Sequence, residues 1–158
     1  MVELPRLGAR GGGWVAIQSI LLATVILVGL LAPGWPDGAR WPLKVVAILL
    51  VVAGGLVLVT AGRALGSGFT PFPRPAPGGE LVETGPYGVV RHPVYSGGIL
   101  VAAGISIALS PWALVATALL AVFWAFKASL EERLLVDRYP GYAEYRERTR
   151  YRLVPYVF

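Results

Sequence analysis

The sequence predicts an all-α integral membrane protein with about four transmembrane helices. Of its 158 residues, 56% are hydrophobic and only 15% are charged, whereas charged residues make up roughly 25% of an average soluble domain. A soluble domain of this size buries too little of its surface to hide so much apolar material. The uncharged residues are moreover concentrated in three long runs. We therefore expect residues 1–158 to form a single membrane domain.

The first two uncharged runs each have the length of one membrane crossing. Residues 14–32 provide 19 uncharged positions and residues 45–62 provide 18. At 1.5 Å per residue each run makes a helix of about 27–28 Å, close to the thickness of the hydrocarbon core. A signal peptide is the alternative for residues 14–32, because Arg6 and Arg10 precede them. The run is longer than the apolar core of a signal peptide, which favours a transmembrane helix.

The third uncharged run, residues 94–126, is too long for a single crossing. Its 33 residues would make a helix of about 50 Å. Ser110-Pro111 interrupts the run near its middle, and proline breaks helices. We therefore predict a short helical hairpin made of residues 94–109 and 111–127. Such a hairpin brings the beginning of its first helix and the end of its second to the same side of the membrane.

Three segments remain outside the predicted crossings. Residues 33–44 form a short loop. Residues 66–90 form a longer loop with four prolines at alternate positions, a pattern that favours a stiff, extended chain. In the amphipathic tail, residues 128–158, the last helix continues to Arg138, and a C-terminal helix lies at the membrane interface. Tyrosines suit such an interface, and the tail contains Tyr139, Tyr142, Tyr145, Tyr151 and Tyr156.

The positive charges predict the orientation in the membrane. With four crossings, both termini and the 66–90 loop share one side, and that side carries twelve of the fourteen lysines and arginines. The other side has only Arg40 and Lys44. By the positive-inside rule, both termini lie in the cytoplasm and the protein spans the inner membrane. The basic excess then serves topology and contact with anionic membrane lipids rather than nucleic-acid binding.

The composition also limits the chemistry that the chain can perform. There is no cysteine and only one histidine. This excludes a disulfide framework, a thiol nucleophile and the common metal sites built from cysteines or a pair of histidines. We therefore expect no metal.

Polar residues gather in two places that the hairpin brings together. The first is residues 85–97, with the sequence GPYGVVRHPVYSG, and the second is Glu131-Glu132-Arg133. Residues 92–95 begin the first helix of the hairpin, and residues 127–132 end its second helix. Because the two arms have equal length, both clusters are expected at the same depth, at the cytoplasmic interface.

One of these clusters suits an anionic group. Pro93 fits the first turn of a helix, where the missing N–H would be unpaired in any case. The N-terminus of a helix carries a partial positive charge, and Arg91 and His92 add to it. We therefore expect this place to bind a carboxylate or a phosphate.

The other groups suit a cation and a flat ring. Glu131 and Glu132 supply negative charge for an ammonium or a sulfonium, and Tyr87 and Tyr95 offer ring faces to a cation or a purine. A ligand with an anionic end, a cationic centre and a flat base matches the whole set. S-adenosylmethionine has all three.

Methyl transfer from a sulfonium requires little from side chains. It is an in-line displacement, so positioning and exclusion of water supply most of the acceleration. A carboxylate or thiolate acceptor needs no base, whereas an amine must first lose a proton. Glu131 and His92 are the candidate catalytic residues because either can accept that proton. We expect a lipophilic or small-molecule acceptor, reached from the membrane, while the cofactor arrives from the cytosol.

The chain also resembles a known family. The run from Gly85 to Gly97, followed by Glu131-Glu132 and then by three tyrosines at residues 139, 142 and 145, resembles the isoprenylcysteine carboxyl methyltransferases and the related phospholipid N-methyltransferases. The resemblance covers about residues 79–156. It implies an integral membrane methyltransferase that binds S-adenosylmethionine at the cytoplasmic interface.

The resemblance further implies the roles of individual residues. The cofactor pocket would be lined by Tyr87, His92, Pro93, Val94 and Tyr95, contacted by the loop Gly79, Glu80, Leu81 and Val82, and completed by an acidic contact from Glu131 or Glu132. The family places an arginine one turn before this glutamate to bind an acidic substrate. Here Lys127 lies four residues before Glu131, and we assign it to substrate binding.

Two alternative functions share this pattern. Membrane enzymes related to sterol reductases bind NADPH with a similar C-terminal hairpin, although they are usually longer. A non-catalytic membrane scaffold or binder of the same fold is the second alternative. His92 would then only cap a helix, and Tyr87 and Tyr95 would anchor the chain at the interface.

Overall fold

The computed structural model describes residues 7–8 and 11–155, so that Arg6, Arg10 and Tyr156 of the sequence predictions lie outside the described residues. Within this part of the chain, all regular secondary structure is helical. The elements are α1 (Gly12–Leu31), η1 (Asp37–Ala39), α2 (Arg40–Leu65), η2 (Gly66–Gly68), η3 (Gly85–Gly88), α3 (Pro93–Leu109), α4 (Pro111–Arg138) and α5 (Tyr142–Arg148).

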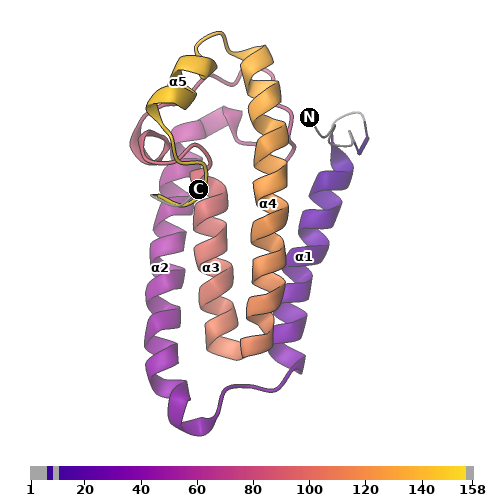
Figure 1. Cartoon of the computed structure of the whole chain (residues 1–158), viewed down its shortest axis with the longest axis vertical. Helices are drawn as coiled ribbons and strands as arrows, with labels where there is room; N and C mark the ends of the chain where they lie inside the picture. Colours follow the sequence, from indigo (N-terminus) through magenta and orange to yellow (C-terminus); the bar gives the residue numbers. More distant parts are fainter. Residues whose placement is uncertain (1–6, 9–10, 156–158) are drawn as a thin grey trace.

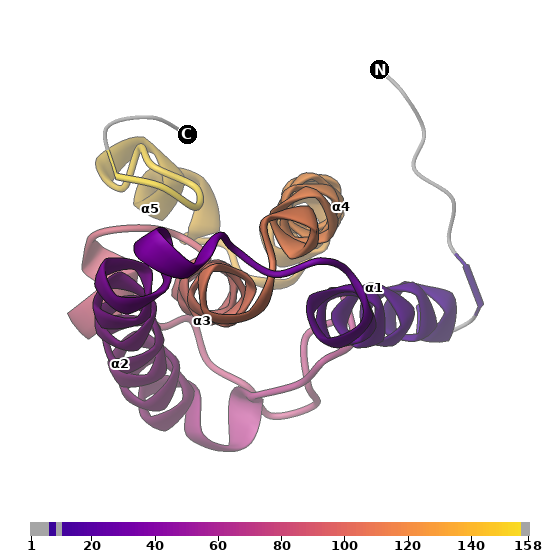
Figure 2. The ribbon, with the colours of Figure 1, turned by 90° about the horizontal axis from the view of Figure 1, so that it is seen from below.

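The four long helices run side by side along the long axis of the molecule (Figure 1). Viewed along the helices, α3 lies between α2 and α4, and α1 packs on the other side of α4 (Figure 2). The short helix α5 covers the end of the bundle opposite the α3–α4 turn. We call this end, formed by residues 66–92, the last turns of α4, and α5, the polar end.

The predicted all-α membrane fold is confirmed. Within the described residues, α1, α2 and α4 are each long and apolar enough to cross a membrane, and α3 is a shorter apolar helix of 17 residues. Many large apolar side chains on α1 and α2 face outward, among them Leu30, Leu31, Leu49 and Leu56. Such exposure is typical of helices that face lipid rather than water.

The predicted hairpin is also confirmed, and one serine fixes its turn. Helix α3 ends at Leu109 and α4 begins at Pro111. The Ser110 hydroxyl accepts the Trp112 N–H at 3.3 Å and donates to the Pro33 carbonyl oxygen at 2.7 Å. It therefore caps α4 and also holds the α1–α2 connection against the hairpin.

Helix α2 is longer than the uncharged run 45–62 from which it was predicted. Its first turn includes Arg40 and Lys44. Arg40 pairs with Asp37 at 2.9 Å, and the Lys44 ammonium lies 4.7 Å from the centre of the Trp41 ring. The run of uncharged residues therefore predicts only the apolar part of α2. The helix extends beyond that part because the charged side chains of its first residues have partners.

The expectation of a stiff, extended chain in residues 66–90 is wrong. The segment is broken by η2, by η3 and by bends between them. Residues 66–90 fold over the polar end because side chains of α4 and of the residue after it donate hydrogen bonds to carbonyl oxygens of this segment. Lys127 Nζ donates to the Pro71 oxygen at 2.7 Å, and the Tyr139 hydroxyl donates to the Gly79 oxygen at 2.8 Å.

Glycines allow α2 and α3 to pack backbone against backbone. A Cβ placed on Gly54 would lie 2.6 Å from the Gly97 carbonyl oxygen, and one on Gly104 would lie 2.7 Å from the Ala47 oxygen. Small residues at such positions are the usual means of close helix packing in membranes. This packing fixes the position of α3, which begins at the polar end.

Gly54→Leu is therefore expected to destabilise the protein by about 1–3 kcal/mol or more, the usual cost of overpacking. The neighbouring Gly55 is the matched control, because nothing lies within 4 Å of a Cβ at that position. Unfolding in mixed detergent micelles, followed by tryptophan fluorescence, measures both variants. Equal midpoints for Gly54→Leu and Gly55→Leu would contradict the close packing of α2 on α3.

Candidate ligand-binding site at the polar end

The predicted meeting of the two polar clusters is present in the structure. His92 stands directly before α3 and faces the last turns of α4. Its Nδ1 lies 3.5 Å from Glu131 Oε2, and its Nε2 lies 3.4 Å from Glu132 Oε1. The imidazole therefore lies between two carboxylates from another helix.

The two glutamates have different surroundings. Glu132 is buried, with 3% of its side chain exposed, and it accepts hydrogen bonds from Arg91 Nε at 2.8 Å and from Arg152 Nη2 at 3.0 Å. Arg91 also donates to two backbone carbonyls of the C-terminal segment, each at 2.7 Å. Glu132 is thus the centre of an ion-pair cluster that joins the residues just before α3, helix α4 and the C-terminal segment.

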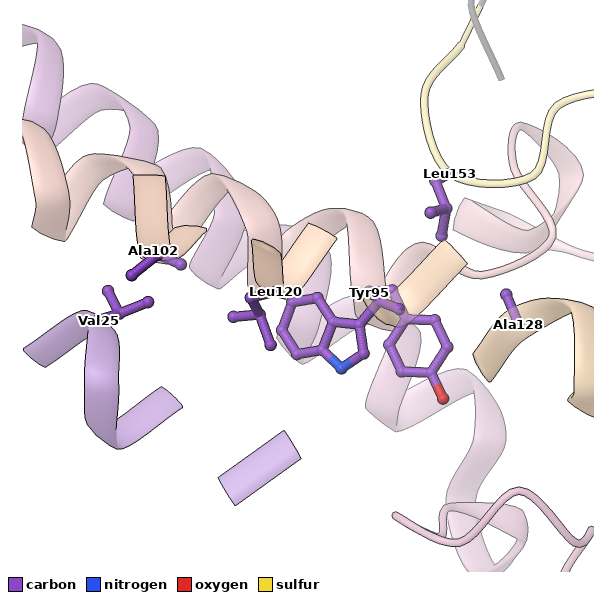
Figure 3. Close-up of a cluster of buried hydrophobic side chains, with 8 residues drawn as sticks. Val25, Tyr95, Ala102, Leu120, Ala128 and Leu153 are labelled. Atoms are coloured by element: carbon purple, nitrogen blue, oxygen red, sulfur yellow. The ribbon is translucent and has the colours of Figure 1, made fainter. Parts of the chain in front are cut away.

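Glu131 instead belongs to an aromatic environment. One of its oxygens accepts a hydrogen bond from the Tyr95 hydroxyl and lies 3.9 Å from Lys127 Nζ. The Tyr95 ring is stacked on His92 at 5.6 Å and on Trp124 at 5.4 Å between ring centres. Figure 3 shows this ring among the buried core side chains, with its hydroxyl at the edge of the cluster.

A cavity at the polar end collects most of the predicted site residues. We call it the polar-end cavity. Of the predicted residues, those that line it are Gly79, Glu80, Leu81, Val82, Tyr87, Arg91, His92, Val94, Tyr95 and Glu131. Three predicted residues do not line it. Pro93 is buried as the first residue of α3, Glu132 lies in the ion-pair cluster, and Lys127 lies deeper in the bundle.

Two tyrosines of α5 close this cavity, so their side chains face the protein interior. Tyr142 and Tyr145 are each 2% exposed and line the cavity. The Tyr145 hydroxyl donates to the Tyr87 carbonyl oxygen at 2.7 Å, whereas the Tyr142 hydroxyl has no hydrogen-bond partner among the described residues. Burial raises the pKa of both phenols well above the ordinary value, so both remain neutral.

A second cavity lies within the bundle, and we call it the bundle cavity. Its walls come from α1 to α4 and are mostly apolar. Phe69, Thr70, Val94 and Tyr95 line both cavities. The remaining residues of the bundle cavity are Gln18, Leu22, Val25, Ile26, Leu58, Pro71, Gly98, Val101, Ala102, Ile105, Trp124 and Lys127.

Lys127 and Gln18 form the polar corner of the bundle cavity. Lys127 is 1% exposed, and its Nζ donates to Gln18 Oε1 at 3.0 Å. Trp124 Nε1 donates to the same oxygen at 2.9 Å. Gln18 is not among the site residues predicted from the sequence. An amide inside an uncharged helix is nevertheless a signal, because polar side chains in transmembrane helices often bind a neighbouring helix.

The fold and the cavities define a class of protein: an integral membrane helical bundle with a charged and aromatic cavity at one end and an apolar cavity beside it. The sequence profile of the family described as phospholipid methyltransferase matches residues 43–141. The chain belongs to this family. The match includes most of α2, which lies outside residues 79–156, the part of the chain that the resemblance covered.

The chain is also similar to a curated protein of known name. The protein is 28% identical over 144 residues to the cobalt-zinc-cadmium resistance protein CzcN of Cupriavidus metallidurans. The alignment covers 89% of this chain and 61% of the relative. The chain thus spans about three fifths of the length of that relative.

Proposed function

We propose that the protein is an integral membrane methyltransferase that transfers a methyl group from S-adenosylmethionine to a lipophilic or small acceptor. The carrying observation is the shared wall of the two cavities, in which Tyr95 contacts both. One compartment is charged and aromatic, and the other is apolar. Membership of the phospholipid methyltransferase family supports the same reaction.

We further propose that the polar end faces the cytoplasm and that the bundle crosses the inner membrane, as the distribution of positive charge indicates. Cofactor then reaches the polar-end cavity from the cytosol. An acceptor with an apolar part enters the bundle cavity from the membrane. Carboxylates, amines and thiols all remain candidate acceptor groups.

The polar-end cavity has the donors and charges that S-adenosylmethionine requires. Glu131 supplies negative charge for the sulfonium, and Tyr87 and Tyr95 supply aromatic faces. Tyr142, which lines the cavity, has a buried hydroxyl without a hydrogen-bond partner among the described residues. Unpartnered buried polar atoms are costly and are expected to find a partner in a ligand.

The polar-end cavity is too small for S-adenosylmethionine unless one of its walls moves. Its volume is about 140 Å³, below the roughly 300–1,000 Å³ of typical ligand sites. Residues 68–76 and 79–82 form one of its walls. A ligand as large as S-adenosylmethionine therefore requires this segment to move outward before it closes again.

When bound, S-adenosylmethionine supplies an electrophilic methyl group. The chain positions the acceptor against the shared wall, and the closed segment 68–82 excludes water. For an amine acceptor, Glu131 Oε2 takes the proton, because it also faces His92 Nδ1 at 3.5 Å and can share the charge with the imidazole. For a carboxylate or thiolate acceptor this proton transfer is not needed.

Lys127 is proposed to orient the acceptor at the polar corner of the bundle cavity. Lys127→Met keeps the length of the side chain and removes the charge. It is expected to lower the initial rate of methyl transfer at least about tenfold, in the range lost when a positioning group is removed. Affinity for S-adenosylhomocysteine is expected to change less than about threefold, because Lys127 does not line the polar-end cavity.

Lys44→Met is the matched control, since Lys44 lies at the start of α2, at the opposite end of the bundle. An unchanged rate in Lys127→Met, or a rate that falls equally in both variants, would remove Lys127 from substrate binding. Incorporation of a radiolabelled methyl group into lipid extracts provides the rate.

The same assay tests the proposed function. Purified protein in nanodiscs is incubated with S-adenosylmethionine carrying a radiolabelled methyl group and with total membrane extract. Label in the extract, lost in Glu131→Ala, is the expected result. If no label is transferred and NADPH binds instead, the reductase-like alternative holds. If neither occurs, the protein is a non-catalytic scaffold or binder.

A further inference from the structure

A basin on the outer surface of the polar end is separate from the two cavities described above. It lies where α4, α5 and the C-terminal segment meet. Its lining contains four arginines and two glutamates, namely Arg91, Arg146, Arg150, Arg152, Glu132 and Glu147. The basin is open and polar, unlike the bundle cavity.

The charges of this basin are not balanced within the protein. Glu132 is already bound by Arg91 and Arg152. Arg146 and Arg150 are both exposed, and within the described residues neither has an acidic side chain within 4 Å. Arg148, which lies between them in the sequence, is paired with Glu83 on the neighbouring segment. The basin therefore presents two arginines that are available to an external anion.

Two exposed apolar side chains stand close in the sequence to arginines of the basin. Val89 is 55% exposed and Val154 is 43% exposed. They stand two residues before Arg91 and two residues after Arg152. Exposed valines close in sequence to the arginines of an open basin suit a surface that meets acyl chains and headgroups together, because arginine side chains favour the interface with anionic headgroups.

We propose that this basin binds the headgroup phosphate of an anionic phospholipid, with the acyl chains lying against Val89 and Val154. Arginine suits this ligand because its planar guanidinium makes paired hydrogen bonds to phosphate oxygens. Arg91 lines both the basin and the polar-end cavity. A lipid in the basin therefore neutralises charge next to the Arg91–Glu132 pair. The proposal does not depend on methyl transfer.

Native mass spectrometry of the full chain in detergent tests it. Phosphatidylglycerol and phosphatidylcholine are added separately, and the retained lipid is counted for each. Arg146→Gln/Arg150→Gln is expected to lower the retention of phosphatidylglycerol at least about fivefold, since each arginine near an anionic surface contributes about 1 kcal/mol. Retention of phosphatidylcholine is expected to stay low and unchanged.

Arg63→Gln/Arg138→Gln is the matched control, because it removes two exposed arginines from the same end of the bundle outside the basin. If this control retains phosphatidylglycerol within about twofold of the unsubstituted protein, the result supports binding in the basin, since distant surface charges contribute weakly. Equal losses in both double variants, or equal retention of the two lipids, would overturn the proposal. Displacement of phosphatidylglycerol by millimolar inorganic phosphate would show a site for free phosphate and would also overturn it.

Discussion

Replacing Glu131 by glutamine is expected to weaken the binding of S-adenosylmethionine at least about tenfold, because truncating one partner of a buried charge pair usually costs 2–5 kcal/mol. Binding of S-adenosylhomocysteine, which lacks the positive sulfur, is expected to change much less. Glutamine keeps the oxygen that accepts the Tyr95 hydrogen bond. The substitution therefore removes the charge and retains the packing.

Titration calorimetry with both ligands measures this difference. Glu144→Gln is the control, since Glu144 is exposed on α5 and is expected to leave both affinities unchanged. If Glu131→Gln weakened the two ligands equally, the carboxylate would not face the sulfonium. If it weakened neither, Glu131 would not belong to the cofactor site.

Glu132→Leu is expected to cost about 3–5 kcal/mol of stability, the usual result of removing one partner from a buried ion pair. The substitution leaves Arg91, whose side chain is 7% exposed, without its counter-charge. It also releases Arg152 and with it the C-terminal segment that runs beside α3. The protein is therefore expected to unfold at lower denaturant, with α5 detaching first.

Equilibrium unfolding in mixed micelles checks this prediction, and Glu147→Leu provides an exposed glutamate as control. The double variant Glu132→Leu/Arg91→Met is expected to recover part of the loss, because no unpaired buried charge remains. A surface ion pair contributes at most about 1 kcal/mol to the free energy of unfolding. If Glu132→Leu lost less than that, the result would contradict the assignment of Glu132 to a buried ion-pair cluster.

The sequence predicted the hairpin and the meeting of His92 with the paired glutamates for local reasons. Pro111 interrupts the helix wherever the rest of the chain lies. The two arms of the hairpin then have similar lengths, so their ends meet. These conclusions follow from helix rise and from one residue type, and they need no knowledge of packing.

Other features depended on contacts between distant segments and were not predictable in this way. Neighbouring residues on a helix point about 100° apart, so Glu131 and Glu132 cannot both face the cavity. The sequence does not show which of them does. In the structure, Glu132 binds Arg91 and Arg152, and Glu131 lines the cavity. The return of the C-terminal segment along α3 depends on backbone hydrogen bonds, such as that from His92 N to the Arg152 oxygen at 3.0 Å. The sequence shows no local signal for it.

Some missed features did have a signal. Tyr142 and Tyr145 are spaced three residues apart within α5, which places their side chains near one face of that helix. That spacing favours a buried face over a scattered interfacial belt. Composition alone does not distinguish a tyrosine that faces the interior of the protein from one that faces the membrane interface.

The most direct test of the account is a calorimetric titration of the purified full chain in nanodiscs with S-adenosylhomocysteine and, separately, with NADPH. Saturable binding of one S-adenosylhomocysteine per chain, with no heat from NADPH and no binding in His92→Ala/Glu131→Ala, is the expected result. Absence of S-adenosylhomocysteine binding, or equal binding in the double variant, would show that the cavity between α3, α4 and α5 is not the cofactor site.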